Sequence, residues 1–314
     1  MKASTLTVLI ASWNGWTKLR TCLRSIYAGH RVPTQIIVID NHSNDGTPER
    51  LREQFPQVEL HENAANFGHT RAINQGFALA RGEYVLVLDD DTELAVDCIE
   101  LLVGFLEANP GAALAGPRMF NSDGTLQESA RNFPSVLSGL FGRQSLLTRL
   151  WPNNRISGKY LAREFLQARE PFEVEQLSGA CMMLRHSVLD QIGPWDGRYI
   201  GYWVDTDWCR SAKQRSLGVY CVPAAHVTHH ESNARGKRKS AHRIWIFHRG
   251  AYQYFTKWHC WGVWDPRSIL AGTMLTARAA CQIGTNQVLH SKRSVEEPVV
   301  EIKPVRPELQ GSEE

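Results

Sequence analysis

The run YVLVLDDDTE, residues 84–93, sets an apolar segment directly before three consecutive carboxylates, Asp89, Asp90 and Asp91. The apolar part is typical of a buried strand, and like charges at its end are costly to hold together unless a cation lies among them. Mg²⁺ and Mn²⁺ prefer carboxylate oxygens, and Mg²⁺ sites commonly combine carboxylates with substrate phosphates and water. The run therefore predicts a divalent-metal site and a phosphorylated substrate. The alternative interpretation is a strand that ends in a solvated acidic turn.

Strand-like and helix-like segments alternate three times before this run. The alternation predicts an α/β fold, a parallel sheet with helices on both faces, whose ligands bind at the carboxyl ends of the strands. Asn14, Asp40 and the three carboxylates all fall at such ends. The expected strands span residues 5–12, 35–40, 58–62 and 84–88, and the expected helices span residues 18–27, 47–55 and a segment from 68.

Beyond the run the periodicity weakens. We expect helices at 94–108, 187–192 and 208–215, strands at 113–120, 172–178 and 218–222, and a hairpin turn at 121–124. Residues 133–170 are irregular, which is typical of a variable substrate loop. Asp205 would lie near a helix N-terminus, where the helix dipole favours an ionised carboxylate.

The sequence becomes basic after Arg235 and then aromatic, and residues 268–283 have the pattern of an amphipathic helix. One interpretation is a helical extension whose aromatic and cationic side chains lie at a bilayer surface. The alternative is a helix packed on the domain with a solvated basic edge. Prolines and charges predict a disordered tail from 286 onward.

The composition limits the classes of function. Of the 314 residues 43% are hydrophobic, which suits a soluble protein with an apolar core. The net charge is only +3, so the protein as a whole lacks the strong positive potential that attracts nucleic acid. The seven cysteines form no C-x-x-C pair, and the N-terminus shows no signal-peptide pattern, so we expect a cytoplasmic protein. No apolar run approaches the roughly 18–20 residues that span a bilayer, so any contact with the inner face of the cytoplasmic membrane is expected to be peripheral.

Several short signatures follow one another in order between Val8 and about Phe255. They are SWNG (12–15), IVIDNHSNDGT (37–47), NFG (66–68) with Arg71 and Asn74, RGEY (81–84), LDDDT (88–92), GPR (116–118), LSGAC (177–181), DTDWC (205–209) and VTHH (227–230). Together they resemble the family 2 glycosyltransferases of the GT-A type, and most closely the bacterial rhamnosyltransferase-like branch. The resemblance implies a Rossmann-like nucleotide-binding half with a mixed central sheet (1–120) and an acceptor-binding half (121–235). The composition adds the C-terminal helical extension (236–285) and the disordered tail (286–314).

The resemblance also implies roles for individual residues. Asp205 matches the catalytic base, although Val204 stands where the family commonly has Glu, so Asp207 remains an alternative base. Many relatives in this branch carry Asn-Pro-Asp at the acidic run, which leaves the ligand set open. The expected metal ligands of Mn²⁺ or Mg²⁺ are Asp91, Asp89 and His229, with His230 as the alternative histidine. The expected nucleotide-binding residues are Ser12, Asn14, Asp40, Asn41, Arg71, Asp89 and Asp90, with Asp40 on the pyrimidine base.

The activity that these expectations imply is inverting, metal-dependent transfer of a sugar from a UDP- or dTDP-sugar, with dTDP-rhamnose as the favoured donor. The acceptor would be a glycan or a lipid-linked molecule in cell-surface polysaccharide synthesis. One alternative is a sugar-nucleotide nucleotidyltransferase, which would need a glycine-rich phosphate loop that Ser12–Gly15 does not supply. The other is a catalytically silent glycan-binding module, against which the presence of Asp205 argues.

Overall fold

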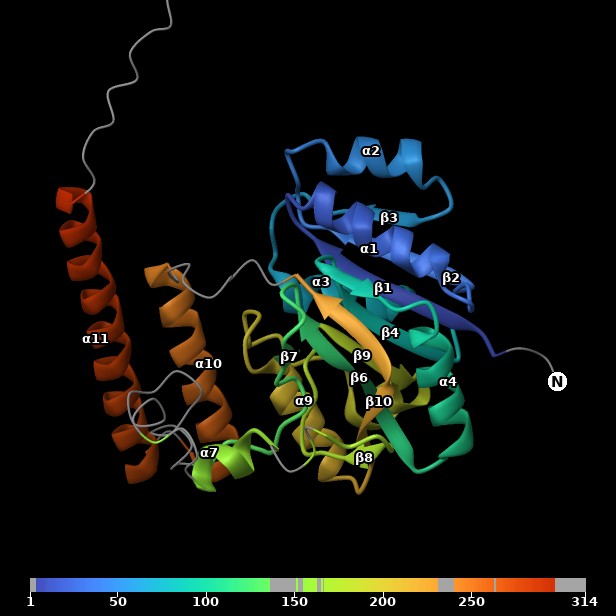
Figure 1. Ribbon diagram of the computed structural model, residues 1–314. Helices are drawn as coiled ribbons and strands as arrows, with labels where there is room; N and C mark the ends of the chain where they lie inside the picture. Colours follow the sequence, from blue (N-terminus) through green and yellow to red (C-terminus); the bar gives the residue numbers. More distant parts are fainter. Residues whose placement is uncertain are drawn as a thin grey trace, which may run out of the picture.

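One mixed sheet organises the computed structural model, which describes residues 4–135, 151, 155–162, 165, 167–230, 240–262 and 264–296 (Figure 1). Within these residues the strand order is β3-β2-β1-β4-β9-β6-β10-β5, with β7 on β6 and β8 on β10. The strands are β1 (Leu6–Ser12), β2 (Gln35–Asp40), β3 (Glu59–Glu62), β4 (Tyr84–Asp89), β5 (Thr92–Leu94), β6 (Ala112–Asn121), β7 (Leu126–Gln127), β8 (Phe172–Glu173), β9 (Cys181–Arg185) and β10 (Gly218–His229). The helices are α1 (Trp16–Ala28), α2 (Thr47–Gln54), α3 (His69–Leu79), α4 (Cys98–Ala108), α7 (Arg155–Tyr160), α8 (Ser187–Ile192), α9 (Val204–Lys213), α10 (Ala241–His259) and α11 (Pro266–Glu296).

The first four strands are parallel, as the alternation of strands and helices predicted. β1 lies between β2 and β4, and the carboxyl ends of the three strands are level: Ser12 pairs with Asp40, and Ala11 pairs with Asp89. The polar residues that follow these strands are therefore neighbours at one edge of the sheet.

The second half of the sheet contains pairings between residues far apart in the sequence. β9 runs antiparallel to β4, and β5 pairs antiparallel with the end of β10, with Thr92 opposite His229. The expected helix at 94–108 begins only at Cys98, because the chain first forms β5. β10 continues to His229 instead of ending at 222, whereas β8 is shorter than the expected strand.

Two apolar clusters fill the two faces of the sheet. Alternate side chains of β1, such as Val8 and Ile10, face the first cluster together with α1, α2 and α4. Leu9 and Ala11 face the second cluster with α3, α8 and α9. This period of two along a buried strand produces a sheet covered on both faces.

Two long helices follow the sheet and lie side by side at one flank of the molecule (Figure 1). α10 is joined to α9 through Asp207, a buried carboxylate that accepts hydrogen bonds from Lys257 Nζ (2.8 Å) and Trp258 Nε1 (2.7 Å). α11 extends to Glu296, past the expected start of the tail at 286, and residues 297–314 lie outside the described residues, as does most of the irregular stretch at 133–170. None of the described helices is long and apolar enough to cross a membrane.

Candidate active site

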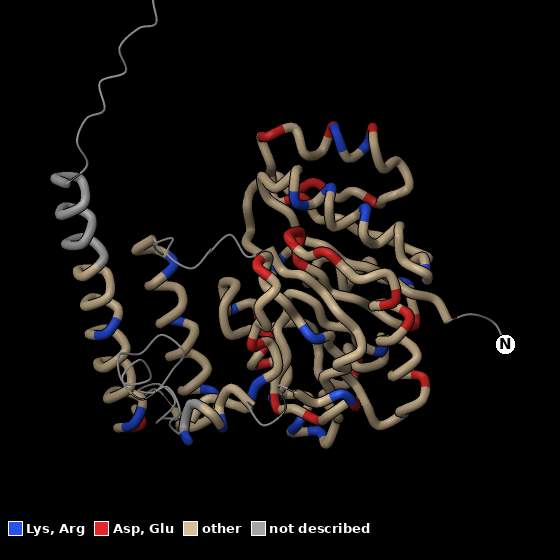
Figure 2. Tube along the Cα trace, viewed as in Figure 1, with Lys and Arg blue, Asp and Glu red and all other residues tan. Residues whose placement is uncertain are grey.

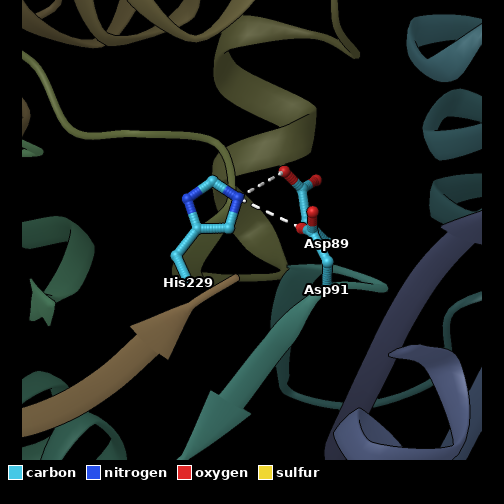
Figure 3. A group of neighbouring side chains, drawn as sticks. All are labelled: Asp89, Asp91 and His229. Atoms are coloured by element: carbon cyan, nitrogen blue, oxygen red, sulfur yellow. Dashed lines mark ion pairs between the residues drawn. The ribbon is translucent and has the colours of Figure 1, made fainter. Parts of the chain in front are cut away.

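Asp89, Asp91 and His229 form a cluster at the carboxyl edge of the sheet (Figure 3). His229 Nε2 lies 3.1 Å from Asp91 Oδ1 and 3.8 Å from Asp89 Oδ2. One ligand atom from each of the three residues lies within 4.8 Å of the others. Two carboxylates and an imidazole at this separation are a donor set that suits a divalent cation.

The backbone explains why these three residues meet. β4 ends at Asp89, and Thr92 Oγ1 donates to the Asp89 carbonyl (2.7 Å), which closes the acidic turn before β5. The amide of His230 donates to the Asp91 carbonyl (2.7 Å), so the end of β10 is fixed beside the turn. β5 therefore brings together residues separated by more than a hundred positions in the sequence.

The ring of His229 is oriented by a second partner. Its Nδ1 lies 3.0 Å from Oε1 of Gln127, a buried side chain on β7. Because an amide oxygen only accepts, Nδ1 carries the hydrogen and Nε2 points at the aspartates. This is the arrangement that a metal-binding histidine needs. His230 differs, since its nitrogens contact Glu93 and Ser122, so the geometry favours His229 of the two expected histidines.

A lysine and a histidine flank the aspartates from opposite sides. Lys18 Nζ on α1 donates to Asp91 Oδ2 (3.0 Å), and His69 Nε2 at the start of α3 lies 3.6 Å from Asp89 Oδ1. Burial alone would raise the pKa of Asp91, but the hydrogen bond and charge of His229 and the charge of Lys18 lower it overall. The carboxylate is therefore held in its ionised, metal-binding form.

Asp90 occupies the position between the two outer aspartates and points toward β1. Its Oδ2 accepts a hydrogen bond from Ser12 Oγ (2.7 Å). Burial, and to a smaller extent the neighbouring carboxylates, raise the pKa of Asp90 to about 7. Gly15 lies so close that an added Cβ would be 2.6 Å from Asp90 Oδ2, which explains the glycine at this point of the β1–α1 loop.

The expected nucleotide-binding residues on β1 and β2 are joined by hydrogen bonds between their loops. The buried Asp40 carboxylate accepts from the amide (2.8 Å) and hydroxyl (2.5 Å) of Ser43. Asn14, at φ 51°, donates its amide to Ser43 Oγ (2.8 Å), and its Oδ1 accepts from the amide of Asn44 (2.8 Å). Asn41 is also buried, and its Oδ1 accepts from Asn63 Nδ2 (3.0 Å).

Arg71 stands apart from these loops. It is exposed on α3, two residues after His69. No hydrogen bond or ion pair that the described residues form joins Arg71 to the loops at the sheet edge, so the structure does not bring this expected residue into the cluster.

Asp205 lies in the first turn of α9, and a short hydrogen-bonded path connects it to Asp89. Its Oδ2 accepts from the amide of Gly179 (3.2 Å), and the carbonyl of the next residue, Ala180, accepts from the amide of Asp89 (2.9 Å). Burial lowers the pKa of Arg131, but Tyr160 and the Asp205 carboxylate outweigh burial and raise it. A permanent positive charge is therefore near Asp205.

Asp207, the alternative base, is placed differently. Its side chain is buried, and Oδ1 accepts hydrogen bonds from Tyr199 Oη (3.1 Å) and Trp258 Nε1 (2.7 Å), while Oδ2 accepts from Lys257 Nζ (2.8 Å). Its contacts tie α9 to α10, which favours a structural role for Asp207.

Lys18 and His69 were missed by the sequence analysis. The available signal was their position: Lys18 is in the first turn after Gly15, and His69 directly follows Gly68. Side chains at the start of a helix that follows a parallel strand lie at the edge where ligands bind. That rule could have placed both residues beside the aspartates.

The sheet has a level edge of parallel strands with paired carboxylates, and a second half of mixed strand direction supplies a histidine. These features define the class: this is the GT-A glycosyltransferase architecture. The chain belongs to glycosyltransferase family 2, since the model described as "Glycosyl transferase family 2" matches residues 7–193. It is also 30% identical, over 81% of its length and 85% of the relative's, to N-acetylglucosaminyl-diphospho-decaprenol L-rhamnosyltransferase from Mycobacterium tuberculosis. The chain is therefore a glycosyltransferase.

Two solved structures share the fold. One is GalNAc-T7 with UDP, GalNAc and Mn²⁺, with a TM-score of 0.57 and 16% identity. The match covers 82% of this chain and 51% of the GalNAc-T7 chain. The other is the mannosyltransferase PcManGT from Pyrobaculum calidifontis with GDP-Man and Mn²⁺ (TM-score 0.55, 17% identity, 95% of this chain and 77% of that chain). At these identities the likeness shows the fold alone.

Proposed function

We propose that the chain is an inverting, metal-dependent glycosyltransferase that moves a sugar from a UDP- or dTDP-sugar to a glycan or lipid-linked acceptor in cell-surface polysaccharide synthesis. The observation that carries the proposal is the cluster of Asp89, Asp91 and His229 beside the β1 and β2 loops. The name of the M. tuberculosis relative gives L-rhamnose as the sugar and a diphospho-decaprenol-linked acceptor. This supports dTDP-rhamnose as the first donor to test and the cytoplasmic face of the membrane as the place of reaction.

The metal proposal rests on the fit of the donor set. Asp89, Asp91 and His229 supply two oxygens and one nitrogen, and Gln127 fixes the histidine ring. Mn²⁺ or Mg²⁺ held there would supply positive charge for the departing nucleoside diphosphate. Lys18 is close enough to add a further positive charge on the same side.

Asp205 is proposed as the base that removes the proton from the acceptor hydroxyl. Its carboxylate is oriented by the amides of Gly179 and Thr206, and it comes from the half of the chain that does not carry the acidic turn. A separate acid is needed, because a carboxylate that binds a metal is a poor proton acceptor. Inverting transfer requires that the acceptor hydroxyl loses its proton on one side of the donor sugar while the nucleoside diphosphate leaves from the other side.

The loops at β1 and β2 are proposed to hold the nucleoside. Ser12, Asn14, Asp40 and Asn41 lie at one edge with Asp89 and Asp90, and their hydrogen bonds fix the loops before a donor arrives. Arg71 is exposed on α3 and would have to turn toward the donor to take part.

The test measures release of nucleoside diphosphate from a panel of UDP-, dTDP- and GDP-sugars, with Mn²⁺, with Mg²⁺ and with EDTA. We expect metal-dependent release that Asp91→Ala abolishes and that Asp190→Asn, an exposed acid on α8, leaves unchanged. Inversion is checked by the anomeric configuration of the product. Donor binding without release would indicate a silent binding module, and formation of pyrophosphate from a nucleoside triphosphate and a sugar phosphate would indicate a nucleotidyltransferase.

A further inference from the structure

α11 turns apolar side chains toward solvent. Ile269, Leu270 and Met274 are 58%, 62% and 54% exposed, whereas Ser268 and Ala279 on the opposite side are fully buried. Successive residues of a helix are turned by about 100°, so these three side chains fall within about 140° of the circumference, on the side away from Ser268 and Ala279. A surface helix normally carries its polar residues there, and an exposed apolar face marks an interaction surface.

Two tryptophans lie in the turn that leads into this helix. Trp261 is 73% exposed and Trp264 is 79% exposed. Asp265 fixes the turn, because its carboxylate accepts from the amides of Trp261 (3.1 Å) and Arg267 (2.9 Å). We call Trp261, Trp264, Ile269, Leu270 and Met274 the α11 patch.

The patch is held firmly on the catalytic domain. Tyr252 Oη and Ser268 Oγ lie 3.0 Å apart and join α10 to α11. α10 is in turn joined to α9 through Asp207 and through Arg210, which donates to Tyr254 Oη (2.9 Å). A groove of about 600 Å³ lined by Tyr252, Ser268, Ile269, Gly272, Thr273, Thr276 and Ala277 runs beside the patch.

The charge around the patch indicates what covers it. Between residues 240 and 285 the sequence has a single acidic residue, Asp265, and five basic residues, Arg243, Arg249, Lys257, Arg267 and Arg278. Arg267 is bonded to Asp265 and Lys257 to Asp207, which leaves Arg243, Arg249 and Arg278 as the positive charges of the two helices that are not committed to these pairs. Lys and Arg segments are distributed along both helices (Figure 2). A second copy of the chain would bring like charges together, whereas anionic lipid headgroups attract them. Tryptophan rings beside basic residues are also typical of the headgroup layer.

We propose that the α11 patch docks the enzyme on an anionic bilayer, with α11 lying in the plane of the headgroups and the tryptophans at their depth. Docking deepens the proposed function, because it would place the active site next to a lipid-linked acceptor; that consequence rests on the proposed function. Binding to lipid does not depend on turnover, and so the two can be tested separately.

The experiment sediments the full chain with vesicles of phosphatidylcholine, with and without phosphatidylglycerol. We expect the protein to bind the mixed vesicles at least about tenfold more tightly than vesicles of pure phosphatidylcholine. Binding to the mixed vesicles should weaken as the salt concentration is raised. Trp261→Ala with Trp264→Ala, and separately Leu270→Glu, should lower the partition coefficient about tenfold or more. Val96→Glu is the matched control and should bind as the wild type does. It replaces an apolar side chain that is 51% exposed in the loop between β5 and α4, far from α11 in the sequence.

The outcomes separate docking from catalysis. Every replaced side chain is exposed, so thermal unfolding and metal-dependent release of nucleoside diphosphate without vesicles should stay at wild-type values. The docking proposal is overturned if the wild type sediments with neither vesicle, if the patch variants bind as tightly as the wild type, or if the patch instead forms a dimer that does not bind lipid. Loss of nucleoside diphosphate release in the wild type would refute the proposed function and leave vesicle binding as an independent result.

Discussion

Asp207→Asn should destabilise the protein and leave its chemistry intact. The Asp207 side chain is 2% exposed and accepts three hydrogen bonds, one of them from the Lys257 ammonium. Asparagine keeps the shape but removes the negative charge and replaces one acceptor with a donor. Lys257 would then lose its buried counter-charge, and one of the three donors would lose its acceptor.

The structure sets the size of this effect. Breaking a buried ion pair by changing one partner costs about 3–5 kcal/mol. The Lys257 side chain is 28% exposed and keeps a second partner, Asp196 Oδ2 at 3.2 Å, so part of the loss is compensated. We therefore expect a loss of roughly 2–3 kcal/mol in the free energy of unfolding. In a chain of this size that lowers the unfolding temperature by about 3–5 °C.

The assay compares Asp207→Asn with Asp205→Asn in thermal unfolding and in initial rates measured well below the unfolding temperature. Asp207→Asn should keep kcat and the donor KM within a few-fold of wild type. Asp205→Asn should instead retain donor binding and lose about 10²–10⁴-fold in kcat. An Asp207→Asn protein that unfolds at the wild-type temperature but has lost turnover would refute this reasoning and assign the base to Asp207.

Four further substitutions test other parts of the structure. The guanidinium of Arg198 lowers the pKa of the Asp196 carboxyl, so its stabilisation is fully present above the unfolded pKa and is lost as pH falls through the lower, folded pKa. Denaturation across pH should show Asp196→Asn less stable by roughly 1 kcal/mol at pH 7, with the difference from wild type shrinking steadily as pH falls from about 4 toward 2. Gly82→Ala should lower the free energy of unfolding in urea by about 3 kcal/mol, because the new Cβ would lie 2.5 and 2.6 Å from two backbone atoms. Gly104→Ala on α4 should instead raise it by about 0.5–1 kcal/mol, because the new Cβ would have no atom of the described residues within contact distance. Lys18→Met removes the cation that competes for Asp91, so calorimetry should show Mn²⁺ binding up to about fivefold tighter; weaker binding would contradict the competition.

The edge of the sheet was predictable because local pattern encodes it. Apolar runs ending at Ser12, Asp40 and Asp89 mark three strands, and the helices between them require those strands to be parallel. Parallel neighbours place their carboxyl ends together whatever the side-chain details. The α/β fold and the position of the acidic turn therefore followed from the pattern, whereas the GT-A class came from the resemblance of the ordered signatures to a known family.

Pairing between distant segments was not predictable in the same way. β5 has three residues, and composition gave no reason to separate them from the helix that follows. Only its pairing with the end of β10 defines it as a strand, and the same pairing decides that His229 rather than His230 faces the aspartates. The choice between neighbouring histidines thus depends on register, in which a shift of one residue reverses the side-chain direction.

The distinction between Asp205 and Asp207 depends on what packs against a helix. Both acids lie in the first turn of α9, where the helix dipole favours either one equally. α10 covers one side of that turn and supplies Lys257 and Trp258 to Asp207, whereas Asp205 faces Gly179 on the path to Asp89. A carboxylate that already accepts hydrogen bonds from three donors is a poor base for a substrate proton. The tertiary contacts, and not the sequence motif, therefore favour Asp205 as the reacting carboxylate.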